Sequence, residues 1–148
     1  MPYWRLHYHL VWATYHREPL LEEQAQQLIS AVAQTKAGTL RIVVHAIGFM
    51  PDHVHLAVSI PPALSVADCV RHFKGASSRR INGDFRAFAW QAEYGAISVG
   101  ERSLPRVIDY VLRQAEHHSS GSTIAALERT TWPTRPPYPG GSSPLQRT

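Results

Sequence analysis

The sequence predicts an α+β fold of the ferredoxin-like type, in which an antiparallel sheet carries two helices on one face. Two observations lead to this prediction. Segments with strictly alternating or β-branched apolar residues indicate strands, whereas apolar residues at helical spacing indicate helices between them. Along the chain these segments follow the order strand, helix, strand, strand, helix, strand, with one more helix after them. This β-α-β-β-α-β order is the split β-α-β pattern.

The first half of the pattern covers residues 3–48. Residues 3–13 alternate in polarity and predict a strand. Pro19 opens an amphipathic helical run, which Gly38 ends. Residues 40–48 (LRIVVHAIG) are rich in β-branched side chains and indicate a buried strand.

The second half begins after the short connection FMPD. Residues 51–59 (PDHVHLAVS) predict a strand that pairs antiparallel with the preceding one. A helix follows from about Val66 to Asn82, and residues 93–99 form a short strand. A last helix carries the sequence RVIDYVLRQAEHH.

Composition predicts one domain, residues 1–118, followed by a polar tail, residues 119–148. The tail is rich in Pro and Gly, and we expect it to be disordered. The formal charge is +4, which favours a polyanionic partner but is common to many proteins. Cys69 is the single cysteine, so the chain forms no intrachain disulfide. The sequence has neither a long apolar run nor the pattern of a signal peptide, and a cytoplasmic protein is therefore predicted.

Two histidines stand out on the strand at residues 51–59. His53 and His55 point to one face of the strand, opposite the apolar Val54 and Leu56. At positions i and i+2, two imidazoles can share one metal ion. An H-x-H pair on a strand is also an ordinary hydrogen-bonding arrangement, and His7 and His9 form a second such pair in this chain.

The last helix adds Tyr110 and Gln114, four residues apart. This spacing places both side chains on one side of a helix, at the edge of its apolar stripe. A helix that packed on the open face of the sheet would present both to His53 and His55. The simpler alternative is a tyrosine that only packs, with its hydroxyl in water.

These residue types suit phosphodiester chemistry. His53, His55 and Gln114 would be three neutral ligands, which leave the charge of the cation available to a phosphate. Oxygen ligands from DNA and water would complete the coordination of Mg²⁺ or Mn²⁺. Tyr110 would be the nucleophile and form a phosphotyrosine. Its phenol, with an ordinary pKa of about 10, needs assistance from the metal or from His117 or His118.

The run KGASSRR is a candidate DNA-binding segment. Its small residues allow close approach to DNA, and Lys74, Arg79 and Arg80 can pair with phosphates. The simpler interpretation of this run is a solvated helix end.

Beyond these spacings, the chain resembles the single-tyrosine HUH transposases, the small transposases of insertion sequences and their repeat-associated relatives. The resemblance extends from about Tyr8 to His118. The segments that carry it, in order, are YHLVWATYHREPLL, AIGFMPDHVHLAVSIPP, FKGASSRRIN, FAWQAEYGAISVG and VIDYVLRQAEHH.

The resemblance implies a function and a set of partners. It implies that His53, His55 and Gln114 bind Mg²⁺ or Mn²⁺ and that Tyr110 cuts single-stranded DNA next to a hairpin at an element end. The products would be a 5′-phosphotyrosine and a free 3′-OH. Insertion-sequence members of the family commonly work as dimers, whereas repeat-associated relatives can act as monomers, so the resemblance makes a homodimer the expectation. DNA binding would bring the protein to the nucleoid. Glu93, where many relatives carry Gly, and the tail after Thr131 depart from the family pattern.

Two other functions remain open at the level of sequence. One is a non-catalytic protein that binds single-stranded nucleic acid on the same fold. The other is a metal-dependent phosphodiesterase that uses water, with Tyr110 in a structural role. A covalent protein–DNA adduct distinguishes the transposase from both.

Overall fold

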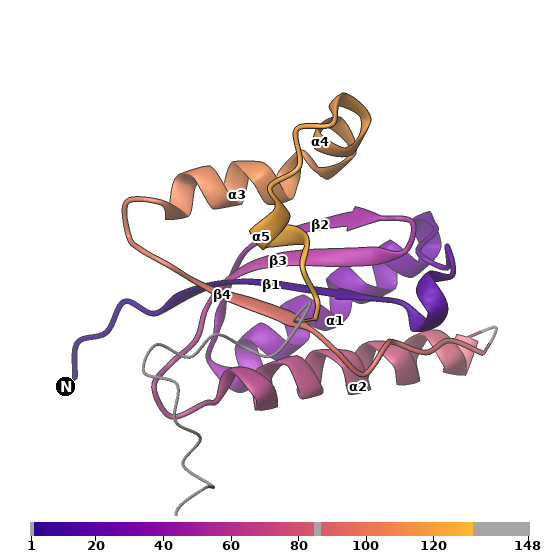
Figure 1. Cartoon of the computed structure of the whole chain (residues 1–148). Coiled ribbons are helices and arrows are strands. Elements are labelled where there is room, and N and C mark those ends of the chain that lie inside the picture. The colour runs from indigo at the N-terminus through magenta and orange to yellow at the C-terminus, as the bar shows by residue number, and fades with distance from the viewer. Residues whose placement is uncertain (1, 85–86, 132–148) are drawn as a thin grey trace, which may run out of the picture.

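Four strands form one antiparallel sheet in the order β2-β3-β1-β4. The computed structural model describes residues 2–84 and 87–131 (Figure 1). The inner strands are β1 (His7–Ala13) and β3 (His53–Ser59), and the edge strands are β2 (Val43–Met50) and β4 (Gly95–Val99). This strand order and the helix connections confirm the predicted ferredoxin-like fold.

Two long helices cover one face of this sheet, as predicted. They are α1 (Glu23–Leu40) and α2 (Val66–Asp84), which lie side by side beneath the strands in Figure 1. Ser65 caps α2 through its Oγ, which accepts a hydrogen bond from the backbone N–H of Asp68 at 3.0 Å. The core on this face joins strand residues to helix residues, including Leu10, Trp12, Val54, Leu56, Ala33, Cys69, Val70 and Phe73.

The remaining helices lie on the opposite face. They are α3 (Leu104–Leu112), α4 (Gln114–Ser120) and α5 (Ala125–Glu128). A short 3-10 helix, η1 (Tyr15–Arg17), is separate from these and directly follows β1. Val107 and Val111 of α3 pack on Ala46 and Ala57 of the sheet. Every residue of β3 is therefore buried, because packed layers cover both of its faces.

The structure corrects the predicted limits of two helices. The first continues past Gly38, which was expected to end it, to Leu40, because Arg41 rather than Gly38 takes the left-handed conformation at its end (φ 56°). α1 begins at Glu23 rather than at Pro19, because the backbone N–H of Leu21 donates to Pro51 O and Glu22 is extended. The predicted last helix is two helices, since the chain leaves helical geometry at Arg113 (φ −108°, ψ 33°). Tyr110 therefore lies on α3, and Gln114 is the first residue of α4.

The first part of the predicted tail has a defined position. α4 continues to Ser120, and α5 follows with Leu127 buried. Gly95 of β4 lies so close to Arg129 that a Cβ atom there would overlap the Arg129 carbonyl oxygen. The rest of the predicted tail, residues 132–148, lies outside the described residues. Within the part of the chain that the structure describes, no helix has the length and apolar character needed to cross a membrane.

Gly48 fixes how closely α3 approaches the sheet, which generates a first prediction. A Cβ atom at Gly48 would overlap the carbonyl oxygen of Val111. We expect Gly48→Ala to lower the free energy of unfolding by about 1–3 kcal/mol, because α3 must move away from β2. Urea denaturation measures this change.

The matched control is Gly38→Ala. Gly38 lies in the last turn of α1, and a Cβ built there has no atom within 4 Å beyond its chain neighbours and the backbone of its own helix. Alanine favours a helix interior over glycine by about 1 kcal/mol, so this variant should be as stable as the wild type or more stable. Equal stability of the wild type and Gly48→Ala would show that the crossing of α3 over β2 is not tightly packed.

Candidate active site

Three histidines from the two inner strands meet on the face of the sheet that α3 covers. His53 and His55 lie on β3, with ring centroids 5.0 Å apart, and His9 lies on the adjacent β1. Their side chains share this face because every second residue of a strand points the same way. His9 and His55 are fully buried, and His53 is nearly so.

Each histidine of the pair is held through its Nδ1 atom. Nδ1 of His53 lies 2.6 Å from Oδ1 of Asp52, and Nδ1 of His55 lies 2.8 Å from Nε2 of His9. Such a hydrogen bond at one ring nitrogen fixes the orientation of the other nitrogen. Both Nε2 atoms consequently face Oε2 of Glu128, at 3.6 Å for His53 and 2.8 Å for His55.

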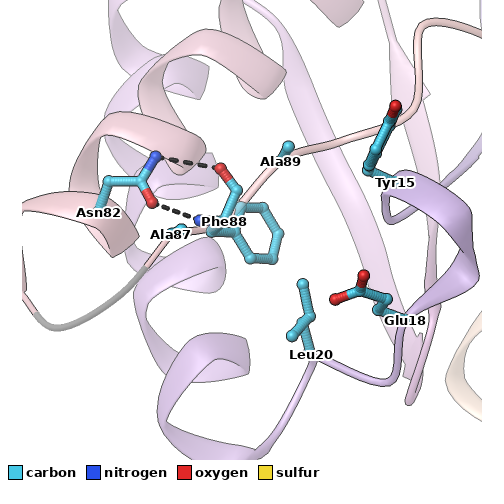
Figure 2. Close-up of a pocket in the computed structure, with 7 residues that line it drawn as sticks. All are labelled: Tyr15, Glu18, Leu20, Asn82, Ala87, Phe88 and Ala89. Carbon is cyan, nitrogen blue, oxygen red and sulfur yellow. Dashed lines mark hydrogen bonds between the residues drawn. The ribbon is translucent and has the colours of Figure 1, made fainter.

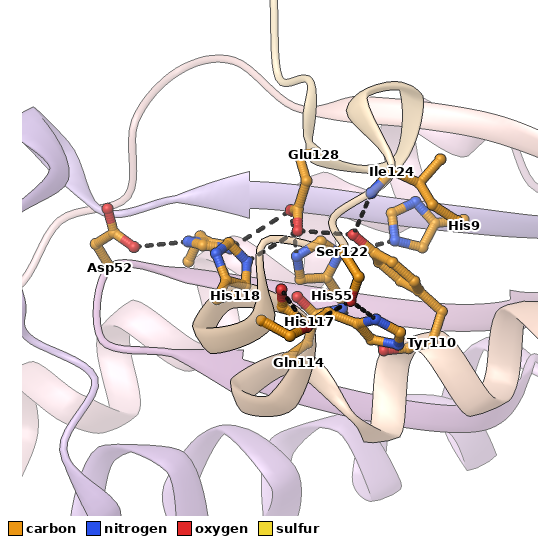
Figure 3. A network of polar contacts seen from close by, with 12 residues as sticks. His9, Asp52, His55, Tyr110, Gln114, His117, His118, Ser122, Ile124 and Glu128 are labelled. Atoms are coloured by element: carbon orange, nitrogen blue, oxygen red, sulfur yellow. Dashed lines mark hydrogen bonds and ion pairs between the residues drawn. The ribbon is translucent and has the colours of Figure 1, made fainter.

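Tyr110 lies beside this pair in the same chain. Its ring centroid is 6.1 Å from that of His55, and the ring of His117 stacks on it at 4.5 Å. The Tyr110 hydroxyl donates to Oε1 of Glu128 at 3.0 Å and accepts a hydrogen bond from the backbone N–H of Ile124 at 2.9 Å. Figure 3 shows these contacts, which fix the hydroxyl oxygen next to the histidines.

Glu128 is the residue that connects the site, and it comes from α5. Its Oε2 faces the two histidines of β3, and its Oε1 contacts Tyr110 and lies 2.9 Å from Nε2 of His118. Figure 3 shows the carboxylate between His118, His55 and Tyr110. One carboxylate thus contacts the predicted nucleophile and both predicted histidine ligands.

The electrostatics of the site follow from burial and from this carboxylate. Burial lowers the pKa of His9 to about 3 and also lowers the pKa of His55. Burial would lower the pKa of His53 as well, but its bonds to Glu128 and Asp52 outweigh burial and raise it. Burial raises the pKa of Tyr110 to about 12. Burial would raise the pKa of Glu128, but the histidines outweigh it and hold that pKa well below its usual range.

Gln114 borders the same site. Its side chain is buried, and its Nε2 donates to the carbonyl oxygen of Tyr110 at 3.0 Å. Its Oε1 is buried and accepts no hydrogen bond from any residue in the described ranges. A buried carbonyl oxygen of this kind requires a partner, and a cation is one.

The donor set at this site fits a metal ion. One ligand atom each from His53, His55, His118 and Glu128 lies within 4.8 Å of all the others. Imidazole nitrogen together with carboxylate oxygen suits divalent first-row metals. The site can therefore hold a metal ion next to the hydroxyl of Tyr110.

The predicted DNA-binding residues lie elsewhere, on α2. That helix covers the other face of the sheet, so Lys74, Arg79 and Arg80 are not brought together with Tyr110. The Lys74 ammonium donates to the carbonyl oxygens of residues 91–93, at 2.8–3.3 Å. Arg79 and Arg80 line a groove between α1 and α2.

A second histidine cluster occupies the same face of the sheet near the start of β1, and we name it the His7 cluster. Ser59 Oγ lies 2.6 Å from Nδ1 of His7 and 2.6 Å from Nε2 of His45, which sits at a bulge in β2. Nε2 of His7 lies 2.7 Å from Glu101, which Arg5 also pairs with. The two histidines of the second H-x-H pair thus have different partners. His7 belongs to this cluster, whereas His9 contacts Nδ1 of His55.

A separate pocket of about 540 Å³ lies at the C-terminal end of α2 (Figure 2). Most of its lining is apolar, and Glu18 supplies its carboxylate. The amide of Asn82 pairs with both backbone groups of Phe88 at its edge, as Figure 2 shows. None of the residues that contact Tyr110 lines this pocket.

Sequence reasoning did not identify three contributors to the site. His9 forms an H-x-H pair with His7, and because such a pair is also an ordinary hydrogen-bonding arrangement, the sequence does not assign His9 to the site. Asp52 directly precedes the H-x-H pair, and a carboxylate next to a candidate ligand is a signal of its supporting role. Glu128 had no signal beyond the short apolar run IAALE within the predicted tail.

The chain belongs to the IS200-like transposase family, because the model of that family, described as "Transposase IS200 like", matches residues 2–114. This match confirms the resemblance found in the sequence. The function of the chain is DNA transposition, and the chain is an enzyme.

Individual relatives agree with this assignment. The chain is 28% identical to the ISDra2 transposase TnpA of Deinococcus radiodurans over 75% of its own length and 85% of that protein. It is 23% identical to the transposase for insertion sequence element IS200 of Salmonella typhimurium, over 93% and 88% of the two chains.

Solved structures have the same fold. A Deinococcus radiodurans R1 protein assigned to the transposases superposes with a TM-score of 0.62 at 27% identity, covering 75% of this chain and 92% of that one. A REP-associated tyrosine transposase bound to a REP hairpin also superposes with a TM-score of 0.62, covering 80% and 74% of the two chains. At 15% identity, that second likeness shows the fold alone.

The role of His9 in orienting His55 generates a second prediction. His9→Phe fills the same space but removes the hydrogen bond to Nδ1 of His55, which then loses its fixed orientation. We expect the affinity for Mn²⁺ to fall about 10–100-fold, as for other residues that orient metal ligands. Isothermal titration calorimetry measures the affinity. His72→Phe, an exposed substitution on α2, is the matched control and should bind as the wild type does.

The His7 cluster generates a prediction about pH. The hydrogen bond from Arg5, followed by that from His7, lowers the pKa of Glu101 to about 2 from an ordinary 4.5. A lowered carboxyl pKa stabilises the folded state above the unfolded pKa, and this contribution is lost as the pH falls from 4.5 towards 2. We expect the urea midpoint of Glu101→Gln to fall less steeply than that of the wild type between pH 5 and pH 3.

Arg5→Gln provides the graded comparison. Because Arg5 is the largest cause of the lowered pKa, this variant should lie between the wild type and Glu101→Gln. Parallel curves for all three proteins would contradict the assigned role of the Arg5–Glu101 pair.

Proposed function

We propose that this transposase cuts and rejoins single-stranded DNA through a covalent 5′-phosphotyrosine on Tyr110. One observation carries the proposal, namely that Tyr110 and the His53/His55 pair contact the same carboxylate within one chain. A nucleophile held beside a metal-binding pair is the arrangement that in-line attack on a phosphodiester requires.

In the proposed reaction, the protein fixes the Tyr110 hydroxyl and this hydroxyl acts as the nucleophile. The two hydrogen bonds of the Tyr110 hydroxyl, to Glu128 and from Ile124, fix the direction of its oxygen. That oxygen attacks phosphorus and displaces the 3′ oxygen of the neighbouring nucleotide, which leaves as a free 3′-OH. Because the phosphotyrosine conserves the energy of the broken bond, a second 3′-OH can reverse the step at another position without ATP.

His53, His55 and Gln114 are the proposed ligands for Mg²⁺ or Mn²⁺. The buried Nε2 atoms of the histidines and the unpartnered Oε1 of Gln114 support this assignment. When bound there, the cation supplies Lewis-acid polarisation of the phosphate under attack. Asp52 and His9 hold the two imidazoles so that their Nε2 atoms stay directed at the site.

The proposed DNA is single-stranded with a hairpin at the element end. One structural relative is bound to a REP hairpin, which supports a hairpin as the class of ligand. Lys74, Arg79 and Arg80 are proposed phosphate contacts on α2, on the face of the sheet away from Tyr110. DNA that contacts both Tyr110 and these basic residues must therefore pass around the edge of the sheet.

The proposal also covers the limits of the domain and the assembly of the protein. Residues 1–118 form the transposase domain in this view, and residues 119–148 form a C-terminal segment whose first part supplies Glu128. The protein acts as a homodimer in the cytoplasm, where it meets its DNA at the nucleoid. The family resemblance supports the dimer, and the position of Tyr110 beside His55 of its own chain supports a tyrosine that acts in cis.

The test of the nucleophile is Tyr110→Phe, which removes one oxygen atom and keeps the ring. Single-stranded oligonucleotides copied from the DNA that flanks the gene are incubated with the protein and Mg²⁺ or Mn²⁺ and separated on a denaturing gel. We expect a metal-dependent protein–DNA adduct with the wild type and a loss of adduct to below detection in Tyr110→Phe. Chelation of the metal with EDTA should abolish the adduct as well.

Tyr3→Phe is the matched control, since Tyr3 is 88% exposed and lies outside the site. It should form the adduct as the wild type does. Metal-dependent cleavage without an adduct would instead establish a phosphodiesterase that uses water. DNA retention without cleavage, unchanged in His53→Ala, would establish a non-catalytic binding protein.

A further inference from the structure

Glu128 enters the site from outside the region that the family model matches. That match ends at residue 114, whereas Glu128 lies on α5. Even so, Glu128 has more polar contacts in the site than any other side chain there that the structure describes. The residues it contacts are His53, His55, Tyr110 and His118.

The position of Glu128 is fixed from both sides along the chain. Before it, the N–H of Ile124 donates to the Tyr110 hydroxyl, and Leu127 is buried. After it, the backbone of Arg129 lies directly against Gly95, and Thr130 is buried. The approach to Gly95 is possible because that residue has no side chain. α5 is thus anchored to both α3 and β4, and its carboxylate is directed into the site.

We propose that Glu128 is itself a ligand of the catalytic metal ion, with Oε2 directed at the ion and Oε1 retained on the hydroxyl of Tyr110. This inference rests on the proposed function, because it assumes that His53 and His55 bind the ion. Its distances within the site carry it. Oε2 of Glu128 lies 2.8 Å from Nε2 of His55 and 3.6 Å from Nε2 of His53. A carboxylate oxygen of Glu128 also lies within 4.8 Å of one ring nitrogen each of His53, His55 and His118.

The chemistry of the ion favours this ligand. His53, His55 and Gln114 are neutral, so by themselves they provide no charge to offset that of a divalent cation. Mg²⁺ and Mn²⁺ prefer oxygen ligands, and a carboxylate is the strongest that a protein offers. Glu128 would therefore raise the affinity of the site and favour these two ions over ions that imidazole alone binds well.

The same carboxylate would connect the ion to the nucleophile. Because Oε1 accepts the hydrogen bond of Tyr110 while Oε2 faces the histidines, one side chain sets the distance between the tyrosine oxygen and the ion. The alternative is that Glu128 fills the site only in the absence of the ion and competes with it. A variant without the carboxylate charge distinguishes the two roles. If Glu128 is a ligand, the variant binds the ion more weakly; if Glu128 competes with the ion, the variant binds it as tightly or more tightly.

The test uses the full-length protein and Glu128→Gln, which keeps the shape of the side chain and removes its charge. We expect the affinity for Mn²⁺, measured by isothermal titration calorimetry without DNA, to fall at least about tenfold. Glu116→Gln, an exposed substitution on α4 with the same chemical change, should bind Mn²⁺ as the wild type does. Circular dichroism of each variant verifies that it is folded.

A second measurement does not depend on the stability of that variant. Wild-type protein labelled with ¹³C at the glutamate side-chain carboxyl groups is titrated with Mg²⁺, and one carboxyl resonance should shift. That resonance is assigned to Glu128 by its absence from Glu128→Gln or, if that variant does not fold, from Glu128→Asp.

The outcomes separate this inference from the proposed function. If Glu128→Gln binds Mn²⁺ as tightly as the wild type or more tightly, Glu128 is not a ligand, and the inference is overturned while the proposed function stands. The same conclusion follows if the Glu128 resonance does not shift with Mg²⁺. If wild-type protein binds no Mn²⁺ at all, the metal-dependent function fails together with the inference.

Discussion

The burial of β3 on both faces is the constraint on which the rest of the molecule depends. One face packs on α1 and α2 through Val54 and Leu56, and the other packs under α3. Histidines on that second face lie away from water, so their ring nitrogens need partners inside the protein. Asp52 and His9 provide those partners on one side of the rings, and the candidate metal site occupies the other. The same burial therefore orders the site and perturbs the pKa values of its members.

Two close backbone crossings bring distant parts of the chain to this face. α3 crosses β2 at Gly48, and the segment after α5 crosses β4 at Gly95. The first crossing positions Tyr110 and Gln114, and the second positions Glu128. The break at Arg113 is compatible with this arrangement, because α3 can pack on the sheet while α4 turns away and directs His118 back towards Glu128. The site is thus assembled by backbone contacts as much as by its own side chains.

The sequence was sufficient to predict the fold and the two histidines of β3, because both depend on local periodicity. Spacing together with the family resemblance predicts Tyr110 and Gln114 as site residues. The single helix predicted for them is wrong, because the chain leaves helical geometry at Arg113, which carries no signal for a helix end. The contribution of His9 depends on the register between β1 and β3, a long-range pairing that alternation alone does not specify. Glu128 depends on the packing of α5 against Gly95, which brings together residues far apart in the sequence. Local patterns therefore gave the elements, and tertiary contacts determined which polar groups meet.

The close packing at Gly48 also affects which mutations a copy of this gene can tolerate. A transposase gene spreads as copies, and each copy then acquires mutations independently. A codon change at position 48 would move the helix that carries Tyr110 and leave the codons of all the proposed site residues unaltered. Glycine at this position is therefore required for the close packing of α3 on the sheet, in addition to the proposed site residues. A copy that keeps His53, His55, Tyr110 and Gln114 but loses Gly48 is therefore expected to hold α3 less closely on the sheet.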